Sequence, residues 1–143
     1  MILVHATTVD IHGQGVLIRG PSGSGKSDLA LRLLDGGARL VADDQTEVSR
    51  QGDQLIARSP DSIAGLLEVR GLGIVKVDYS PWVALALVVD LVADDKIERL
   101  PEPGSEQFFG ISLPCLDLAG FQVSAAAKVR LAVFSAKRDI MLS

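Results

Sequence analysis

The sequence predicts an α/β fold in which one helix packs against a mixed, partly antiparallel sheet. Lys26–Asp35 has the character of a helix, because Leu29 and Leu33 share a face and Gly36 and Gly37 follow to end it. Many short apolar segments have the character of strands instead. Because strands and helices do not alternate along the chain, a regular parallel sheet with a helix after every strand is not expected.

The expected strands are short, rich in Val, Leu and Ile, and separated by turn residues. They are Met1–Val4, Val16–Arg19, Ala38–Ala42, Thr46–Arg50, Gln54–Ala57, Leu66–Val69, Ile74–Val77, Val83–Val89 and Val129–Phe134. Turns or loops are expected at 12–15, near Gly52 and over Pro101–Gly110. No repeat, low-complexity tract or linker divides the sequence, so residues 1–143 are expected to form a single domain.

Composition and charge exclude several classes of protein. The 143 residues are 48% hydrophobic, which excludes a disordered chain. The net charge is −4 and the Lys and Arg residues are scattered, so no nucleic-acid partner is expected. The longest apolar run, Val83–Val89, is too short to span a membrane. The apolar content is high for a small monomer, and a buried interface between subunits would account for it.

Redox and targeting signals favour a cytoplasmic protein. The single cysteine, Cys115, cannot form an internal disulfide, and its apolar surroundings predict a buried thiol rather than a catalytic one. The segment Met1–Val4 has neither a basic region nor a long apolar run, so no signal peptide is expected.

The strongest motif is Gly20–Ser27, which matches the phosphate-binding loop pattern G-x-x-x-x-G-K-[ST] in full. Its glycines allow successive backbone amides to converge on one anion, and the following helix directs its positive dipole end at the same place. Lys26 is expected to contact the β- and γ-phosphates of ATP, and Ser27 to bind Mg²⁺. The predicted nucleotide-binding residues are Gly20, Ser22, Gly23, Ser24, Gly25, Lys26, Ser27 and Asp28. The alternative is a flexible Gly/Ser loop without a ligand.

Two adjacent carboxylates, Asp43 and Asp44, follow the apolar strand Ala38–Ala42. Because side chains alternate along a strand, the two acids are expected to have different roles, one as a general base and one at the metal or its waters. The alternative is a turn capped by Asp. The acidic strand comes directly after the helix of the phosphate-binding loop, which fits a generic GTPase or motor ATPase poorly.

Three segments taken together resemble bacterial HPr kinase/phosphorylase. They are Gly20–Ser27, Leu40–Asp44 (LVADD) and Leu67–Ile74 (LEVRGLGI), and the third is the signature of that family. The resemblance extends from His5 to Val133 and corresponds to the C-terminal catalytic domain of the longer members. It implies a fold related to phosphoenolpyruvate carboxykinase, a hexamer, and Mg·ATP-dependent phosphorylation of a serine on HPr, the phosphocarrier of the sugar phosphotransferase system.

The resemblance also implies roles for individual side chains. Lys26 corresponds to the phosphate-binding lysine, Ser27 to a magnesium ligand and Asp43 to the proton acceptor. Asp44 corresponds to a neighbour that assists at the metal, and Glu68 to a second magnesium-associated residue. His5 corresponds to a histidine beside the active site, and Arg99 to an arginine that engages the transferring phosphate. Each also has an ordinary structural alternative: a rim histidine for His5, an exposed pair with Arg70 for Glu68, and a solvated charge for Arg99. Gly71 and Gly73 are expected to form a tight turn that brings Glu68 to the phosphates.

One segment departs from the family pattern. The stretch Val123–Arg130 lacks the Pro and Gly of a segment tied to dephosphorylation by inorganic phosphate, so kinase activity is a firmer expectation than phosphorolysis. Two other hypotheses remain open, a kinase of a small molecule or of another protein, and a non-catalytic ATP sensor.

Overall fold

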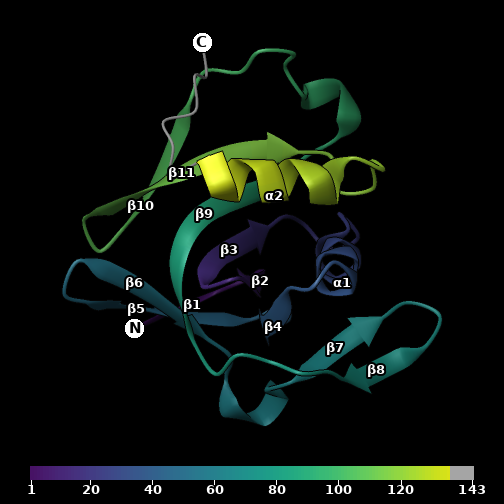
Figure 1. Cartoon of the computed structure of the whole chain (residues 1–143), viewed down its shortest axis with the longest axis vertical. Coiled ribbons are helices and arrows are strands. Elements are labelled where there is room, and N and C mark those ends of the chain that lie inside the picture. Colours follow the sequence, from purple (N-terminus) through teal and green to yellow (C-terminus); the bar gives the residue numbers. More distant parts are fainter. Residues whose placement is uncertain (136–143) are drawn as a thin grey trace.

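The computed structural model describes residues Met1–Ser135, and within them nine strands form one mixed sheet while two more form a separate hairpin (Figure 1). The main sheet contains β1 (Ile2–Val4), β2 (Ala6–Ile11), β3 (Gln14–Arg19), β4 (Arg39–Ala42), β5 (Thr46–Gln51), β6 (Gln54–Arg58), β9 (Val83–Leu91), β10 (Gly104–Phe108) and β11 (Ile111–Leu118). The remaining elements are β7 (Leu66–Val69), β8 (Gly73–Lys76), the helices α1 (Lys26–Asp35) and α2 (Ala125–Ser135), and the 3₁₀ turns η1 (Asp61–Ile63) and η2 (Asp94–Lys96).

The sheet has the order β1-β5-β6-β9-β3-β2-β4, and β11 and then β10 extend it beside β9. The pairs β3–β9 and β9–β11 are parallel, whereas the other strand pairs of this sheet are antiparallel. The predicted mixed, partly antiparallel sheet is therefore confirmed. The strand β9 bends along its length, so that its start pairs with β6 and its end pairs with β11 (Figure 1).

The helix α1 has the predicted bounds. It begins after Gly25, whose φ of 99° is left-handed, and it ends at Gly36, which is followed by Gly37 with φ 105°. Leu29 and Leu33 are fully buried against the sheet, as their shared face predicts. No helix in the described part of the chain is long and apolar enough to cross a membrane.

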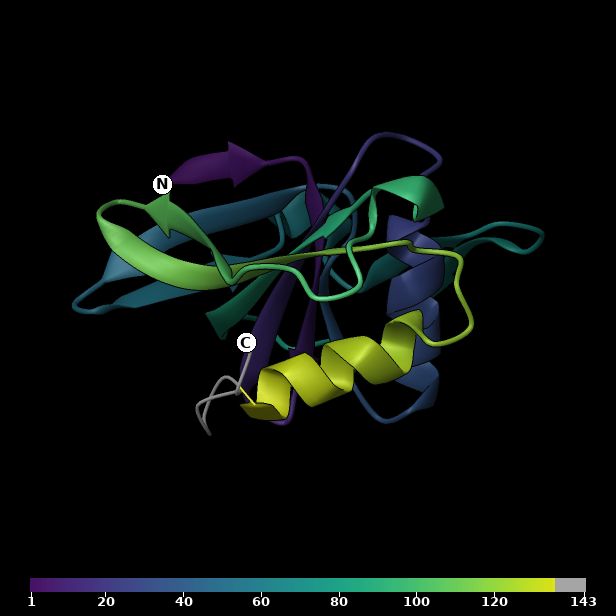
Figure 2. The same ribbon diagram turned by 90° about the horizontal axis from the view of Figure 1, so that it is seen from above.

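Two hydrophobic clusters lie on opposite faces of the central strands. Alternation along β3 sends Val16 and Ile18 to one face, where α1 and α2 pack, and Leu17 to the other, which β5 and β6 cover. The hairpin of β7 and β8 projects away from the main sheet on the side of α1, as Figures 1 and 2 show.

The predicted strand Val129–Phe134 is wrong, because these residues belong to α2. The buried positions Ala125, Val129 and Val133 recur every four residues and face the sheet, whereas Leu131 is 68% exposed. This is the period of a helix that buries one face. A short apolar run taken alone did not reveal it.

The predicted loop Pro101–Gly110 is wrong for its second half, which contains β10. This strand pairs with β11 through the two-residue turn Phe109–Gly110, in which both φ angles are positive, 52° and 80°. Such turns usually carry Asn-Gly or Asp-Gly. The strand β2 was not foreseen either; it joins β3 through the similar turn His12–Gly13.

Candidate active site

The phosphate-binding loop Gly20–Ser27 connects the end of β3 to the start of α1. A tight turn closes the loop, in which the Ser24 amide donates to the Pro21 carbonyl oxygen at 3.0 Å. Gly23 has φ 81°, and a Cβ placed there would meet no other atom within 4 Å, so the loop faces open space at this point. No side chain caps the start of α1. Its first backbone amides therefore remain available for an anion.

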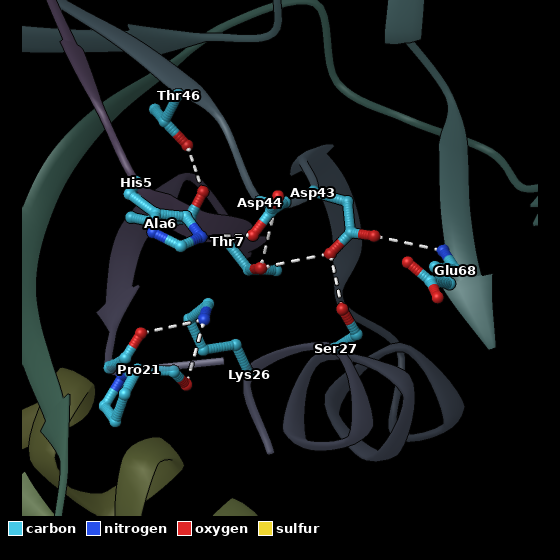
Figure 3. Close-up of polar contacts among 11 residues, drawn as sticks. His5, Ala6, Thr7, Pro21, Lys26, Ser27, Asp43, Asp44, Thr46 and Glu68 are labelled. Atoms are coloured by element: carbon cyan, nitrogen blue, oxygen red, sulfur yellow. Dashed lines mark hydrogen bonds and ion pairs between the residues drawn. The ribbon is translucent and has the colours of Figure 1, made fainter. Parts of the chain in front are cut away.

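Lys26 lies under this loop and is only 7% exposed. Its Nζ donates to the carbonyl oxygens of Gly20 at 2.8 Å and Pro21 at 3.3 Å (Figure 3). Ser24 Oγ is buried and has no hydrogen-bond partner among the described residues. A buried hydroxyl without a hydrogen-bond partner lowers stability. A phosphate oxygen that accepted a hydrogen bond from this hydroxyl would therefore stabilise the loop.

Asp43 directly follows β4 and its side chain is directed toward the start of α1 (Figure 3). Its Oδ1 accepts hydrogen bonds from Ser27 Oγ at 2.7 Å and from Thr7 Oγ1 at 3.0 Å. Its Oδ2 accepts the Glu68 amide at 3.0 Å. Three donors from three separate segments therefore hold a carboxylate that is only 8% exposed. The sequence-predicted residues Asp43 and Ser27 lie in direct contact.

Asp44 turns the other way and is exposed. Its φ of 67° is left-handed, a conformation that Asp tolerates better than most residues. Its Oδ1 lies 2.6 Å from His5 Nε2, and both side chains are more than half exposed, at 61% and 58%. The predicted site residues His5 and Asp44 therefore form a pair on the rim, beside the buried Asp43.

Glu68 reaches the site on the hairpin of β7 and β8. Gly71, with φ 93°, lies in the tight turn of this hairpin, and Gly73, with φ 106°, begins β8 directly after it. The Glu68 amide contacts Asp43, and its carboxylate is exposed beside the pocket (Figure 3). The hairpin thus holds a third carboxylate next to Asp43 and Asp44.

These groups surround a pocket of about 300 Å³ at the start of α1. Its lining is Ser22, Gly23, Gly25, Lys26, Ser27, Asp28, Leu31, Asp43, Asp44, Glu68, Val69, Arg70 and Phe121. Most sequence-predicted site residues are in this set. The predicted residues outside this set are Gly20, Ser24, His5 and Arg99. Arg99 is exposed on the segment between η2 and β10 and makes no hydrogen bond to another described residue.

The donor set of the pocket fits Mg²⁺. Ser27 Oγ and the carboxylates of Asp44 and Glu68 supply oxygen donors, and magnesium prefers oxygen ligands while keeping several waters. In the described part of the chain, no group of three or more His, Cys, Asp or Glu side chains converges as a ready metal cage. A magnesium ion bound here would complete its coordination with waters or with oxygens of a polyphosphate.

Thr7 is a site residue that sequence reasoning missed. It is fully buried on β2, donates to Asp43, and accepts the Asp44 amide at 3.1 Å. The pairing of β2 with β4 brings it there. The only signal was a pair of adjacent threonines, Thr7 and Thr8, in the segment Ala6–Ile11, which does not specify a partner.

Behind the phosphate-binding loop, Arg19 joins three strands. Its Nε and Nη2 donate to Asp90 at 2.7 and 2.9 Å, and its Nη1 donates to Glu106 Oε2 at 2.7 Å. Burial opposes ionisation of Asp90, but hydrogen bonds from Arg19 and Cys115 outweigh it and hold the pKa of Asp90 below its usual value. The hydrogen bond from Arg19 likewise lowers the pKa of Glu106.

Cys115 is half-buried rather than fully buried. Desolvation, followed by its hydrogen bond to Asp90, raises the pKa of this thiol to about 11. Nucleophilic cysteines instead have a lowered pKa. The raised pKa does not favour a nucleophilic thiolate at Cys115.

The comparisons with known proteins all find similarity to HPr kinases. Residues 1–82 match the family described as HPr Serine kinase C-terminal domain. An HPr kinase/phosphorylase of Halalkalibacterium halodurans is 50% identical over 96 residues, which cover 62% of this chain and 31% of that protein. An HPr kinase/phosphorylase of Bacillus cereus is 56% identical over 75 residues, covering 52% of this chain and 24% of that protein. The matched regions thus span less than a third of the length of these curated relatives.

A solved structure resembles the fold over nearly its whole length. The structure of the Hpr(Ser) kinase/phosphatase from Coxiella burnetii superposes with a TM-score of 0.85 and 26% identity. The superposition covers 96% of this chain and 97% of the other. The arrangement of strands and helices is therefore that of an Hpr(Ser) kinase/phosphatase structure.

Proposed function

Because this chain belongs to the family of HPr serine kinase C-terminal domains, we propose that it transfers the γ-phosphate of ATP to a serine of an HPr-type phosphocarrier protein. The observation that carries the proposal is the 2.7 Å hydrogen bond between Ser27 Oγ, at the end of the phosphate-binding loop, and Asp43 Oδ1. It joins a site suited to a polyphosphate to a buried carboxylate suited to accept a proton.

The proposed reaction needs one proton acceptor. The serine hydroxyl oxygen of the substrate attacks the γ-phosphorus, the bond from that phosphorus to the β,γ-bridging oxygen breaks, and ADP leaves. Asp43 takes the hydroxyl proton as the new bond forms, and such a base typically contributes about 10²–10⁴-fold in rate. Thr7 and the Glu68 amide keep the carboxylate in place throughout.

The remaining rate comes from positioning and charge neutralisation. Lys26 and the first amides of α1 bind the β- and γ-phosphates, which requires the Lys26 ammonium to exchange one of its loop carbonyls for a phosphate oxygen. When bound, magnesium would neutralise part of the negative charge on the phosphates. Ser27, Asp44 and Glu68 would hold the ion directly or through its waters.

His5 and Arg99 are the remaining residues of the proposal. His5 orients Asp44 through their 2.6 Å contact. Arg99 reaches the transferring phosphate only if the exposed segment between η2 and β10 moves toward the pocket when the protein substrate binds. This role of Arg99 rests on the family resemblance alone.

Several finer parts of the proposal rest on the family. They are a cytoplasmic location, a hexameric assembly, and a reverse reaction in which inorganic phosphate attacks phosphoserine to give pyrophosphate. In that reverse reaction Asp43 returns its proton to the serine oxygen. Light scattering tests the assembly, and labelled phosphoserine HPr incubated with excess inorganic phosphate tests the reversal.

The test of the kinase reaction is incubation of the protein with [γ-³²P]ATP, Mg²⁺ and its cognate HPr. We expect serine-linked label on HPr, and we expect Asp43→Asn to lower the rate at least about 10²-fold while ATP affinity stays within about twofold. The matched control is Asp53→Asn, an equal change in the exposed turn between β5 and β6. It should leave the rate unchanged.

The outcomes separate the alternatives. Label on another acceptor but not on HPr would mean a kinase of a different substrate. ATP binding without transfer to any acceptor would mean a nucleotide sensor. Near-normal turnover of the Asp43→Asn variant would remove Asp43 from the role of the base.

A further inference from the structure

A second pocket, of about 540 Å³, lies on the other side of the phosphate-binding loop. Three segments line it: residues 21–24 of the loop, residues 91–94 at the end of β9 and just beyond it, and residues 119–122 after β11. Leu91, Val92, Ala93 and Ala119 give it apolar walls. The proposed phosphoryl transfer assigns nothing to this pocket.

The topology explains why two pockets meet at one loop. Since β3, β9 and β11 are parallel neighbours, their carboxyl ends reach the same edge of the sheet. Since β2 is antiparallel to both β3 and β4, the strand β4 runs in the same direction as β3, and its end delivers Asp43 to that edge as well. The phosphate-binding loop therefore lies between the end of β4 on one side and the ends of β9 and β11 on the other. Ligands of open α/β sheets bind at this edge.

The two pockets share part of their lining at the loop. Ser22, Gly23 and Phe121 line both of them. A nucleotide whose terminal phosphate lies beside Asp43 must extend its base away from Asp43. The apolar pocket lies on the side of the loop away from Asp43, where such a base can extend.

Phe121 offers a flat surface at the junction. Its ring packs over the loop, because a Cβ placed on Gly25 would lie 3.1 Å from the ring Cζ. The side chain is nevertheless 65% exposed, so much of the ring has no protein partner. An exposed aromatic ring beside apolar walls is suited to stack on another planar aromatic group.

Arg32 of α1 fixes the segment that carries this ring. Its Nη1 donates to the Gln122 carbonyl oxygen at 2.9 Å, and its Nη2 donates to the carbonyl oxygen of Gly120. The two carbonyls flank Phe121. The helix that begins at the phosphate-binding loop therefore also positions the ring.

We infer that the apolar pocket receives the nucleobase of the nucleotide whose phosphates bind Gly20–Ser27, with Phe121 as its stacking surface. The inference rests on the proposed binding of ATP by this loop. The pocket edge is polar: Gln122 Nε2 donates to Asp94 Oδ1 at 2.6 Å, which leaves Asp94 Oδ2 free of hydrogen bonds to described residues. That oxygen can accept from the exocyclic amine of adenine.

The test compares two ligands that share a triphosphate, of which only ATP carries a ribose and a base. Calorimetric titrations with ATP and with inorganic tripolyphosphate, both with Mg²⁺, are run on the wild type and on Phe121→Ala. We expect the wild type to bind ATP at least about fivefold more tightly than tripolyphosphate. In Phe121→Ala the ATP affinity should fall about 5- to 100-fold and the tripolyphosphate affinity should not change.

Two further variants control for disturbance of the loop. Phe121→Tyr keeps the ring and should keep the ATP affinity. Val123→Ala alters a side chain that is 98% exposed on the same segment and outside the pocket, and it should have no effect on either ligand.

Equal loss of both ligands in Phe121→Ala, or no loss of either, would overturn the base site. If the wild type bound neither ligand, the base site and the proposed kinase would both be wrong. Failure of the HPr labelling with ATP binding intact would remove the kinase proposal and leave the base site standing.

Discussion

At the residue scale, the orientation of Asp43 depends on a side chain outside the recognisable motifs. Thr7 Oγ1 donates to Asp43 Oδ1 and accepts the Asp44 amide, so one hydroxyl holds both acids that follow β4. Thr7 is completely buried. Water therefore cannot replace the hydroxyl if it is removed.

We predict that Thr7→Val lowers the rate of phosphoryl transfer roughly tenfold and leaves ATP affinity unchanged, because the carboxylate loses one of its three fixed donors. The lost hydrogen bond should also lower the free energy of unfolding by about 1–2 kcal/mol. Steady-state labelling of HPr together with urea unfolding measures both effects. Thr7→Ser keeps the hydroxyl and should restore most of the rate.

The neighbouring Thr8 provides the matched control. It is equally buried, but its hydroxyl forms a hydrogen bond with Thr46 Oγ1 at 2.8 Å and makes none with Asp43. Thr8→Val should therefore cost similar stability without a specific loss of transfer rate. Equal loss of rate in both valine variants would mean that Thr7 has only a structural role.

The sequence predicts part of this site because part of it is local. Ser27 and Asp43 belong to successive elements, a loop motif of known geometry and the strand that follows its helix, so their proximity could be expected. Thr7 and Phe121 reach the site only through the pairing of β2 with β4 and the packing of the segment after β11. Such contacts join distant parts of the chain, and no local pattern in one sequence specifies them.

At the element scale, the Arg19 network ties together the strands beside the phosphate-binding loop. Arg19 ends β3, Asp90 lies near the end of β9, and Glu106 lies on β10. The guanidinium is bidentate on Asp90, a geometry that gives strong and oriented hydrogen bonds. The network therefore helps to fix the strand end from which Gly20 begins the loop.

We predict that Asp90→Asn lowers the free energy of unfolding by about 1–3 kcal/mol at neutral pH, because a partly buried Arg19 loses its charged partner. The folded-state pKa of Asp90 lies below its ordinary value of 3.8, so the wild-type advantage is present above about pH 4 and is lost as the pH falls through the lowered pKa. Urea unfolding of both proteins from neutral pH down to about pH 3 measures this convergence.

Asp117 supplies the control for this prediction. It lies opposite Asp90 on β11 and is exposed, and it makes no hydrogen bond to another described residue. Asp117→Asn should leave the free energy of unfolding nearly unchanged at every pH. A constant difference between wild type and Asp90→Asn down to the lowest pH would contradict the charge-dependent stabilisation.

Elements were predictable where a local signal was strong. The helix α1 has its apolar face and the glycine that ends it close together in the sequence, and the sequence predicts both correctly. The helix α2 has a weaker signal, since its inward face is built largely from Ala125, Ala126, Val129 and Val133 while Leu131 and Phe134 face outward. Its apolar residues thus occur on both faces, which conceals the helical period.

At the scale of the whole molecule, the absence of strand-helix alternation was informative. It predicted a mixed sheet, and the sheet contains parallel pairs only at β3–β9 and β9–β11 within the described residues. The same two central strands contribute to both hydrophobic clusters, with Val16 and Leu87 on one face and Leu17 and Val88 on the other. Neither cluster can lose its central strands without exposing the other.

We therefore predict that the chain unfolds as one cooperative domain. Urea unfolding followed by the fluorescence of Trp82, the single tryptophan, and by far-ultraviolet circular dichroism should give coincident transitions. Mg·ATP at about 100 times its dissociation constant should raise the free energy of unfolding by about 2.7 kcal/mol, equally by both probes, because the phosphate-binding loop joins β3 to α1. Lys26→Ala should abolish this ligand effect while keeping a single transition. Two separated transitions, or a ligand shift seen by one probe alone, would mean that the clusters unfold independently and that residues 1–143 are not one domain.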